Sequence, residues 1–140
     1  MVDLVTNRLF MKEGAFRYTY FTSLYQETFQ FYKDTLGFEL AHAWDRSAND
    51  KGALFKAGKG FIEILQSPDH PSHENQGLDY RSPQGVFMCI QLWEIDDWFK
   101  KYKAADVAFK QEITDQEWGH RSFSVVEPNG LVLFFFQEQF

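Results

Sequence analysis

Hydrophobic and polar positions along the chain predict the same order of elements twice. Short stretches rich in aromatic and β-branched residues, bounded by turn-forming residues, are typical of strands. In the first half they span residues 15–22, 38–44, 53–57 and 61–66, and in the second half 85–93, 107–112, 121–126 and 131–137. In both halves, the gap after the first strand is long enough for a helix.

Helical periodicity fills that gap in both halves. In the first half, one helix face contains Tyr25, Phe29, Tyr32 and Leu36, which recur every three to four residues. Ser23 with Gln26 predicts a capping box at its start, and Gly37 predicts a left-handed stop. The second helix is predicted over 95–105, with Ile95, Trp98, Phe99, Tyr102 and Ala105 on one face.

Turn-forming residues separate these elements and divide the chain. A polar turn is predicted over 45–51, a hairpin turn around 58–60 and a tight turn at Asn129-Gly130. The strongest break in composition is the Pro-, Ser- and Asn-containing stretch 67–84, which predicts a linker. We therefore expect an α+β fold of two βαβββ modules that form a curved mixed sheet around a cavity. Module one spans about 15–66 and module two about 85–138 of a single domain, 1–140, with residues 1–14 as an arm.

Composition and charge narrow the class of partner. Aromatic residues make up 19% of the 140-residue chain, which suits a packed core and also pockets for flat ligands. The net charge of −6 argues against nucleic acid as a partner, because such binding requires a basic face. The single cysteine, Cys89, excludes an internal disulfide. With no predicted signal peptide and no apolar run long enough to span a bilayer, we expect a cytoplasmic protein without a membrane partner.

Three short motifs resemble one known superfamily. Residues 31–38 are FYKDTLGF, residues 118–125 are WGHRSFSV, and residues 127–130 are EPNG. Their order and spacing resemble those of the vicinal oxygen chelate superfamily, which includes glyoxalase I, extradiol dioxygenases, and fosfomycin- and bleomycin-resistance proteins. Glu127 stands where that pattern usually has Asp. The resemblance covers about residues 15–138 and implies the two-module fold expected above.

The resemblance also allows a test for a metal. Enzymes of the superfamily hold a divalent metal with one side chain from the first and one from the fourth strand of each module. In this chain those positions fall on Arg17, Glu63, Phe87 and Phe134. Of these, only Glu63 can be a ligand, since Arg has no lone pair to offer. A shift of one or two residues could bring in Gln91 but no His or Glu on the third and fourth of these strands. We therefore expect no metal and no cofactor.

Arg17 and Glu63 suggest a replacement for the metal. If both point into the same half-cavity, an ion pair could form there. The alternatives are a surface Arg on an edge strand and a partly exposed Glu on a wet sheet face. Mid-strand burial of the carboxylate would be costly without a partner.

Further ligand-binding candidates come from aromatic and polar residues near the motifs. The predicted set is Arg17, His42, Glu63, Phe87, Trp118, His120, Arg121 and Phe134. Trp118 could stack on a flat ligand at the cavity mouth, or it could support the fold. Arg121 could bind ligand, or it could pair with an acidic residue and brace its loop. His70 and His73 lie in the predicted linker and are expected to be solvated.

Three functions remain open at this point. The leading hypothesis, from the bleomycin-resistance branch, is a metal-free homodimer that sequesters an aromatic or cationic drug-like molecule. The second is a lyase, isomerase or dioxygenase-type enzyme with Glu63 as general base or metal ligand. An Arg17–Glu63 ion pair would argue against the general-base role. The third is a structural or regulatory dimer with a vestigial cavity.

Overall fold

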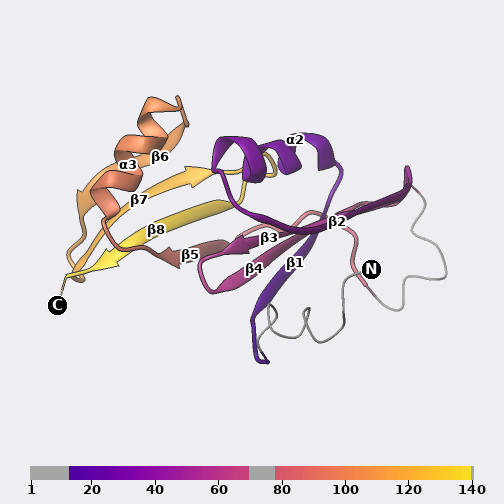
Figure 1. The fold of residues 1–140 in the computed structure, drawn as a ribbon, viewed down its shortest axis with the longest axis horizontal. Helices are drawn as coiled ribbons and strands as arrows, with labels where there is room; N and C mark the ends of the chain where they lie inside the picture. Colours follow the sequence, from indigo (N-terminus) through magenta and orange to yellow (C-terminus); the bar gives the residue numbers. More distant parts are fainter. Residues whose placement is uncertain (1–12, 70–77, 140) are drawn as a thin grey trace.

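The structure, a computed structural model, describes residues 13–69 and 78–139, and its elements follow the predicted order (Figure 1). Module one contains β1 (Arg17–Thr22), α2 (Tyr25–Gln30), the π-helical segment η1 (Phe31–Thr35), β2 (Leu40–Ser47), β3 (Asp50–Ala57) and β4 (Gly60–Gln66). Module two contains β5 (Phe87–Gln91), α3 (Ile95–Ala104), β6 (Phe109–Asp115), β7 (His120–Val126) and β8 (Val132–Glu138). The α+β fold of two βαβββ modules is therefore confirmed.

Each module has its own four-stranded mixed sheet. The strand orders are β1-β4-β3-β2 and β5-β8-β7-β6, so the two sheets have the same topology. In each, the first strand is parallel to the fourth and the other pairs are antiparallel. The two sheets are not closed into one continuous surface, and β1 and β5 are edge strands.

The first helix starts and ends differently from its prediction. It begins at Tyr25 with Leu24 as N-cap and without a side-chain cap, so the capping box of Ser23 and Gln26 is wrong. Instead, the Leu24 amide donates to Thr22 Oγ1 at 2.9 Å, and Thr28 Oγ1 donates to the Leu24 carbonyl. The last turn is π-helical, closed by the Leu36 amide on the Phe31 carbonyl at 2.8 Å. The left-handed stop at Gly37 is confirmed by its φ of +73°.

The polar turn predicted over 45–51 is much shorter in the structure. Strand β2 continues to Ser47 and β3 already begins at Asp50. The contacts of the Trp44 side chain with β3 account for this longer pairing. The Trp44 indole lies directly over Gly52, where a Cβ would overlap the ring, and its Nε1 donates to Asp50 at 3.0 Å. A half-buried aromatic residue on an edge hairpin can thus extend pairing through polar sequence.

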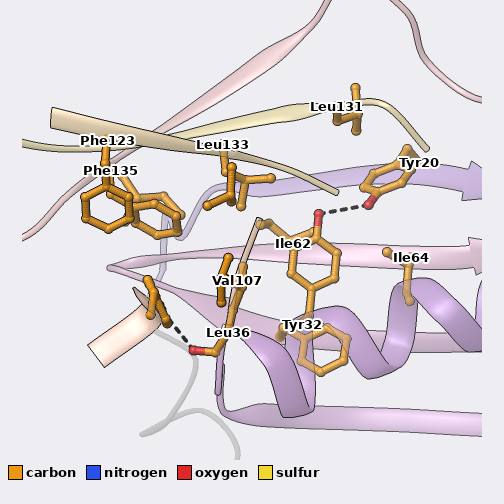
Figure 2. Packing of buried hydrophobic residues seen from close by; sticks show 14 of the residues in the cluster. Tyr20, Tyr32, Leu36, Ile62, Ile64, Val107, Phe123, Leu131, Leu133 and Phe135 are labelled. Atoms are coloured by element: carbon orange, nitrogen blue, oxygen red, sulfur yellow. Dashed lines mark hydrogen bonds between the residues drawn. The ribbon is translucent and has the colours of Figure 1, made fainter. Parts of the chain in front are cut away.

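One hydrophobic core joins the two modules. Ile62 and Ile64 of module one belong to the same buried cluster as Leu133 and Phe135 of module two, and Figure 2 shows part of this cluster. The predicted helix faces are confirmed in part, since Tyr32, Leu36, Ile95 and Tyr102 are buried. The Tyr102 hydroxyl donates to the Leu36 carbonyl at 2.9 Å, so a module-two helix caps the end of the module-one helix. The two modules thus pack against each other through a shared core.

Two predicted segments fall partly outside the described residues. Most of the arm, 1–12, and the middle of the linker, 70–77 with His70 and His73, lie there. The described ends of the linker return to module one, where the Ser67 hydroxyl donates to the Tyr80 carbonyl and Tyr80 packs edge-on against Phe21. Among the helices that the structure describes, none is long and apolar enough to cross a membrane.

Candidate functional site

In module one, the predicted ion pair is present. Arg17 Nη1 lies 3.1 Å from Glu63 Oε2, and Thr19 Oγ1 donates to Glu63 Oε1 at 3.0 Å. The pair forms because β1 is parallel to β4 with Thr19 opposite Glu63, which brings these three side chains to one face. The Glu63 side chain is 13% exposed and Arg17 is 41% exposed. Both carboxylate oxygens therefore accept a hydrogen bond at the solvent boundary.

In module two, the equivalent positions carry two phenylalanines. Cys89 lies opposite Phe134 just as Thr19 lies opposite Glu63, so Phe87 and Phe134 correspond to Arg17 and Glu63. The Phe87 and Phe134 rings pack edge-on with centroids 5.3 Å apart. Strand order is the same, but the chemistry of the face has changed from charged to aromatic.

These four positions do not fit the divalent metal of the superfamily. A guanidinium and two phenyl rings have no lone pair to donate, and the fourth side chain, Glu63, is occupied by Arg17 and Thr19. Within residues 13–69 and 78–139 no cluster of three His, Cys, Asp or Glu side chains has the arrangement of a metal site.

The two modules meet at two junctions, each made by the turn between the third and fourth strand of one module. At the first, which we call the closed junction, the β7–β8 turn reaches β1 and α2 of module one. The Glu127 side chain is 1% exposed, and its carboxylate accepts four hydrogen bonds. The donors are the Tyr20 hydroxyl at 3.0 Å, Asn129 Nδ2 at 2.7 Å, and the amides of Asn129 and Leu131 at 2.6 and 2.8 Å.

Further bonds extend this network into module one. Asn129 also bonds Thr22 Oγ1 and Thr28 Oγ1, and the Tyr20 hydroxyl bonds the Tyr32 hydroxyl at 2.9 Å (Figure 2). Burial, and next Tyr32 and Glu127, raise the pKa of Tyr20 far above its usual value. Burial likewise raises the pKa of Tyr32, although its bond to Tyr20 acts in the opposite direction. Both phenols are therefore neutral at any ordinary pH.

At the second, the open junction, the β3–β4 turn reaches β5 of module two. A Cβ built on Gly58 would lie 3.5 Å from Ile90, the residue that corresponds to Tyr20. Instead of a hydrogen-bond network, this junction holds a cleft of about 820 Å³. Its walls include Phe16, Tyr18, Lys59, Phe87, Gln91 and Trp93.

Turn length explains why this junction is open. Residues 58 and 59 alone connect β3 to β4, whereas residues 127 to 131 connect β7 to β8. The short turn and the first residue of β4 also bring in two glycines, Gly58 and Gly60, so Lys59 has the only side chain between Ala57 and Phe61. Gly60 cannot readily gain a side chain, because its Cβ would lie 3.0 Å from the Phe16 carbonyl oxygen. The missing turn residues and side chains leave the space that the cleft occupies.

The cleft includes only one of the predicted ligand-binding residues, Phe87. His42 packs against Trp44 on the outer hairpin of module one, with ring centroids 5.7 Å apart. His120 stacks on Phe136 in module two, with centroids 4.5 Å apart, and Trp118 packs edge-on beside His120. Trp118 is 63% exposed and is not among the residues that line the cleft.

Arg121 has the bracing position that sequence analysis left open. Its guanidinium makes two-pronged contact with Asp96 at the start of α3, with Nη2 2.8 Å from Oδ1, and bonds Asp115 at 3.1 Å. Arg121 lowers the pKa of Asp96, mainly through these hydrogen bonds. The arginine therefore ties β7 to α3 and β6.

Sequence reasoning missed most of the cleft. Phe16, Trp93 and Lys59 were assigned only to strand or turn, yet Phe16 is 73% and Trp93 is 70% exposed. Exposed apolar side chains that gather in one patch mark a binding surface, and both of these line the cleft. The available signal was that Trp93 follows a strand end and that Gly58-Lys59-Gly60 is shorter than its module-two counterpart.

Comparisons with known proteins agree with this architecture. Residues 15–135 match the model of the Glyoxalase/Bleomycin resistance protein/Dioxygenase superfamily. Among solved structures, a lactoylglutathione lyase from Agrobacterium tumefaciens is similar, with a TM-score of 0.68, 14% identity, and 90% of this chain and 94% of that chain covered. TioX from Micromonospora sp. ML1 has a TM-score of 0.67 and 15% identity, with coverages of 89% and 98%.

A third solved structure is described as a glyoxalase/bleomycin resistance protein/dioxygenase from Nocardioides. It has a TM-score of 0.68 and 18% identity, and the similarity covers 95% of this chain and 93% of that chain. At these identities the structural matches show a common fold. A search of curated protein sequences found no match.

Proposed function

Because this chain belongs to the glyoxalase/bleomycin resistance protein/dioxygenase superfamily, we propose that it is a metal-independent protein that binds a flat aromatic small molecule. The observation that carries this proposal is the open-junction cleft. Its volume of about 820 Å³ is of the size that small-molecule sites have, and five aromatic residues are among those that line it. Drug sequestration, the role expected from the bleomycin-resistance branch, would be one use of such a site.

The cleft residues suit stacking on a planar ring. Phe16 and Trp93 are largely exposed, and Phe87 is 62% exposed despite its contact with Phe134. Binding a flat molecule between them would remove apolar area from water on both sides of the ligand. Offset or edge-on aromatic contacts add about 0.5–1.5 kcal/mol each.

The test is a fluorescence titration with naphthalene-type ligands on Trp93→Ala and Phe87→Ala. Each substitution should weaken binding about five- to tenfold, by the loss of about 1 kcal/mol or more of stacking. Trp118→Ala is the matched control, since it removes an equally exposed indole away from the cleft. Loss of binding in Trp118→Ala with none in Trp93→Ala would instead put the ligand on the module-two face. No saturable binding at all would contradict the proposal.

Metal independence has its own measurement. Arg17, Phe87 and Phe134 stand at three of the four ligand positions of the superfamily enzymes, so purified protein should carry no stoichiometric divalent metal. Elemental analysis of the protein, before and after treatment with EDTA, checks this. About one tightly held metal per chain would refute it, as would a loss of ligand affinity after EDTA that added metal restores.

We also propose that two copies of the chain associate. The face of β7 and β8 leaves Val126 exposed and the phenylalanines Phe134 and Phe136 partly exposed, and a second copy would cover them. Sedimentation over a range of concentrations should show a dimer. A concentration-independent mass of 16.5 kDa would contradict this proposal without affecting the cleft.

The enzyme alternative finds less support. A general base must present a free oxygen to the substrate. Both oxygens of Glu63 already accept hydrogen bonds, and Glu63 does not line the cleft. For this reason we prefer binding to catalysis by Glu63.

A further inference from the structure

The charge of the cleft narrows the class of ligand. Among the described residues that line it, Lys59 alone carries a formal charge, and no carboxylate is present. We propose, resting on the function proposed above, that the cleft selects a planar aromatic anion such as an aryl carboxylate, with Lys59 as the residue that determines this preference. The aromatic part of the ligand expected from the sequence, an aromatic or cationic molecule, is kept, and an anionic group takes the place of the cationic one.

The position of Lys59 is set by a rigid turn. Gly58 has a φ of +59°, which favours glycine, and the Phe61 amide donates to the Phe16 carbonyl at 2.8 Å. Gly60 lies against that same carbonyl. These contacts tie the turn to the start of β1, so the lysine extends from a fixed backbone at the rim of the cleft.

Lys59 differs from three other lysines in its surroundings. Lys33, Lys56 and Lys103 each form an ion pair with a nearby carboxylate. Within the described part of the chain, the Lys59 ammonium has no such ion pair. In a chain with a net charge of −6, an unpaired lysine beside an aromatic cleft is available to an anionic ligand.

Hydrogen-bond donors in the cleft complement the lysine. Gln91, which has a side-chain amide, and Tyr18, which has a phenol, are among the residues that line it. Burial, and next the charge of Glu127, raise the pKa of Tyr18, so its hydroxyl keeps its proton. A phenol that remains protonated can donate to a carboxylate oxygen, as can the Gln91 amide. A ligand cation would find no carboxylate among the residues of this lining.

Three compounds of nearly the same shape test the charge preference. They are 2-naphthoate, 2-naphthamide and 2-naphthylmethylammonium, which are anionic, neutral and cationic at pH 7.5. At low ionic strength the anion should bind about two- to fivefold more tightly than the amide, as for other ion pairs near a surface, and the cation should bind most weakly. Raising the salt concentration should bring the affinity for naphthoate towards that for the amide.

Variants of the turn assign the preference to Lys59. Lys59→Gln should abolish the advantage of naphthoate, Lys59→Glu should reverse it, and Lys59→Arg should keep it. Lys110→Gln is the matched control, because it changes the net charge equally but lies on β6, outside the cleft lining. It should leave the preference unchanged.

The outcomes separate this inference from the proposed function. If all three compounds bind equally well, with affinities that depend on Trp93 and Phe87, the cleft binds aromatic molecules and the role of Lys59 is wrong. The same holds if the preference for naphthoate survives in Lys59→Gln. If none of the compounds binds, or none depends on Trp93 or Phe87, the proposed function itself fails.

Discussion

The closed and open junctions are built from corresponding parts of the two modules. At the closed junction, Glu127 and Asn129 of the β7–β8 turn bond Tyr20, Thr22 and Thr28 across the boundary. At the open junction, the β3–β4 turn meets Ile90 where the other junction has Tyr20, and it carries glycines in place of the polar side chains. A polar hydrogen-bond network therefore fills the closed junction, whereas the open junction contains a largely apolar cleft.

This difference separates structural integrity from binding. A buried polar network is stable only when its groups are satisfied, so it holds one geometry and resists change. Apolar walls impose no such condition and can accept ligands of several shapes. In a duplicated fold, one junction can thus fix the modules relative to each other while the other is free to bind.

The largest expected effect comes from opening the closed junction. Glu127→Ala removes the acceptor of four hydrogen bonds and leaves buried donors, including the Leu131 amide, without a partner. We expect the free energy of unfolding to fall by about 3 kcal/mol, measured by urea denaturation. Glu127→Gln keeps the shape and part of the acceptors, so its loss should be smaller.

The corresponding change at the open junction is the control. Lys59→Ala removes an exposed side chain that makes no ion pair within the described residues, and it should change the free energy of unfolding by no more than about 0.5 kcal/mol. Equal losses of the free energy of unfolding in Glu127→Ala and Lys59→Ala would contradict the view that the closed junction stabilises the fold and the open junction does not.

The tyrosines of the closed junction predict an alkaline limit to stability. Tyr20 and Tyr32 have raised pKa values in the folded chain, chiefly through burial, whereas in the unfolded chain they ionise near pH 10. Above pH 10 the unfolded state therefore binds fewer protons than the folded state, and stability falls as the pH rises. Each such tyrosine should contribute about 1.4 kcal/mol per pH unit.

Tyr20→Phe isolates this contribution. The free energy of unfolding, measured by denaturation between pH 8 and pH 11, should fall less steeply with pH in the variant. The difference in slope should be about the contribution of one tyrosine given above. Lysines titrate in the same range, but they are the same in both proteins and cancel in the difference. Parallel curves for the wild type and Tyr20→Phe above pH 10 would contradict the prediction.

The fold could be predicted from the sequence because the patterns that indicate its strands, helices and turns are local. Strand composition and helical periodicity predicted all eight described strands and both helices, although not the π-helical end of the first helix, and Gly37 and Gly130 have the left-handed φ angles expected at a helix stop and a tight turn. The prediction of a Ser23–Gln26 capping box was wrong because the N-cap is Leu24, one residue after Ser23. The side chain that accepts a hydrogen bond at this helix start is Thr22, from the Leu24 amide.

The candidate site could be predicted from the sequence only in part. The Arg17–Glu63 pair could be predicted, since both residues lie at family positions on neighbouring strands. The cleft could not, because it depends on how far one turn reaches across to the other module, which is a tertiary property. Glu127 was noted only as a substitute for Asp, yet its carboxylate is the acceptor around which the closed junction is organised.

The smallest expected effect concerns the two corresponding pairs on the sheet faces. Arg17–Glu63 is an ion pair at the solvent boundary, and Phe87–Phe134 is an edge-on aromatic pair at equivalent positions. Double-mutant cycles with Arg17→Met and Glu63→Gln, and with Phe87→Ala and Phe134→Ala, should each give a coupling of about 0.5–1 kcal/mol. Because Arg17 is 41% exposed, salt should screen its coupling to Glu63, and we expect it to fall by about half in 1 M NaCl. The aromatic coupling involves no net charge and should not fall. If both couplings respond to salt alike, the contrast between a charged face in module one and an aromatic face in module two is wrong at these positions.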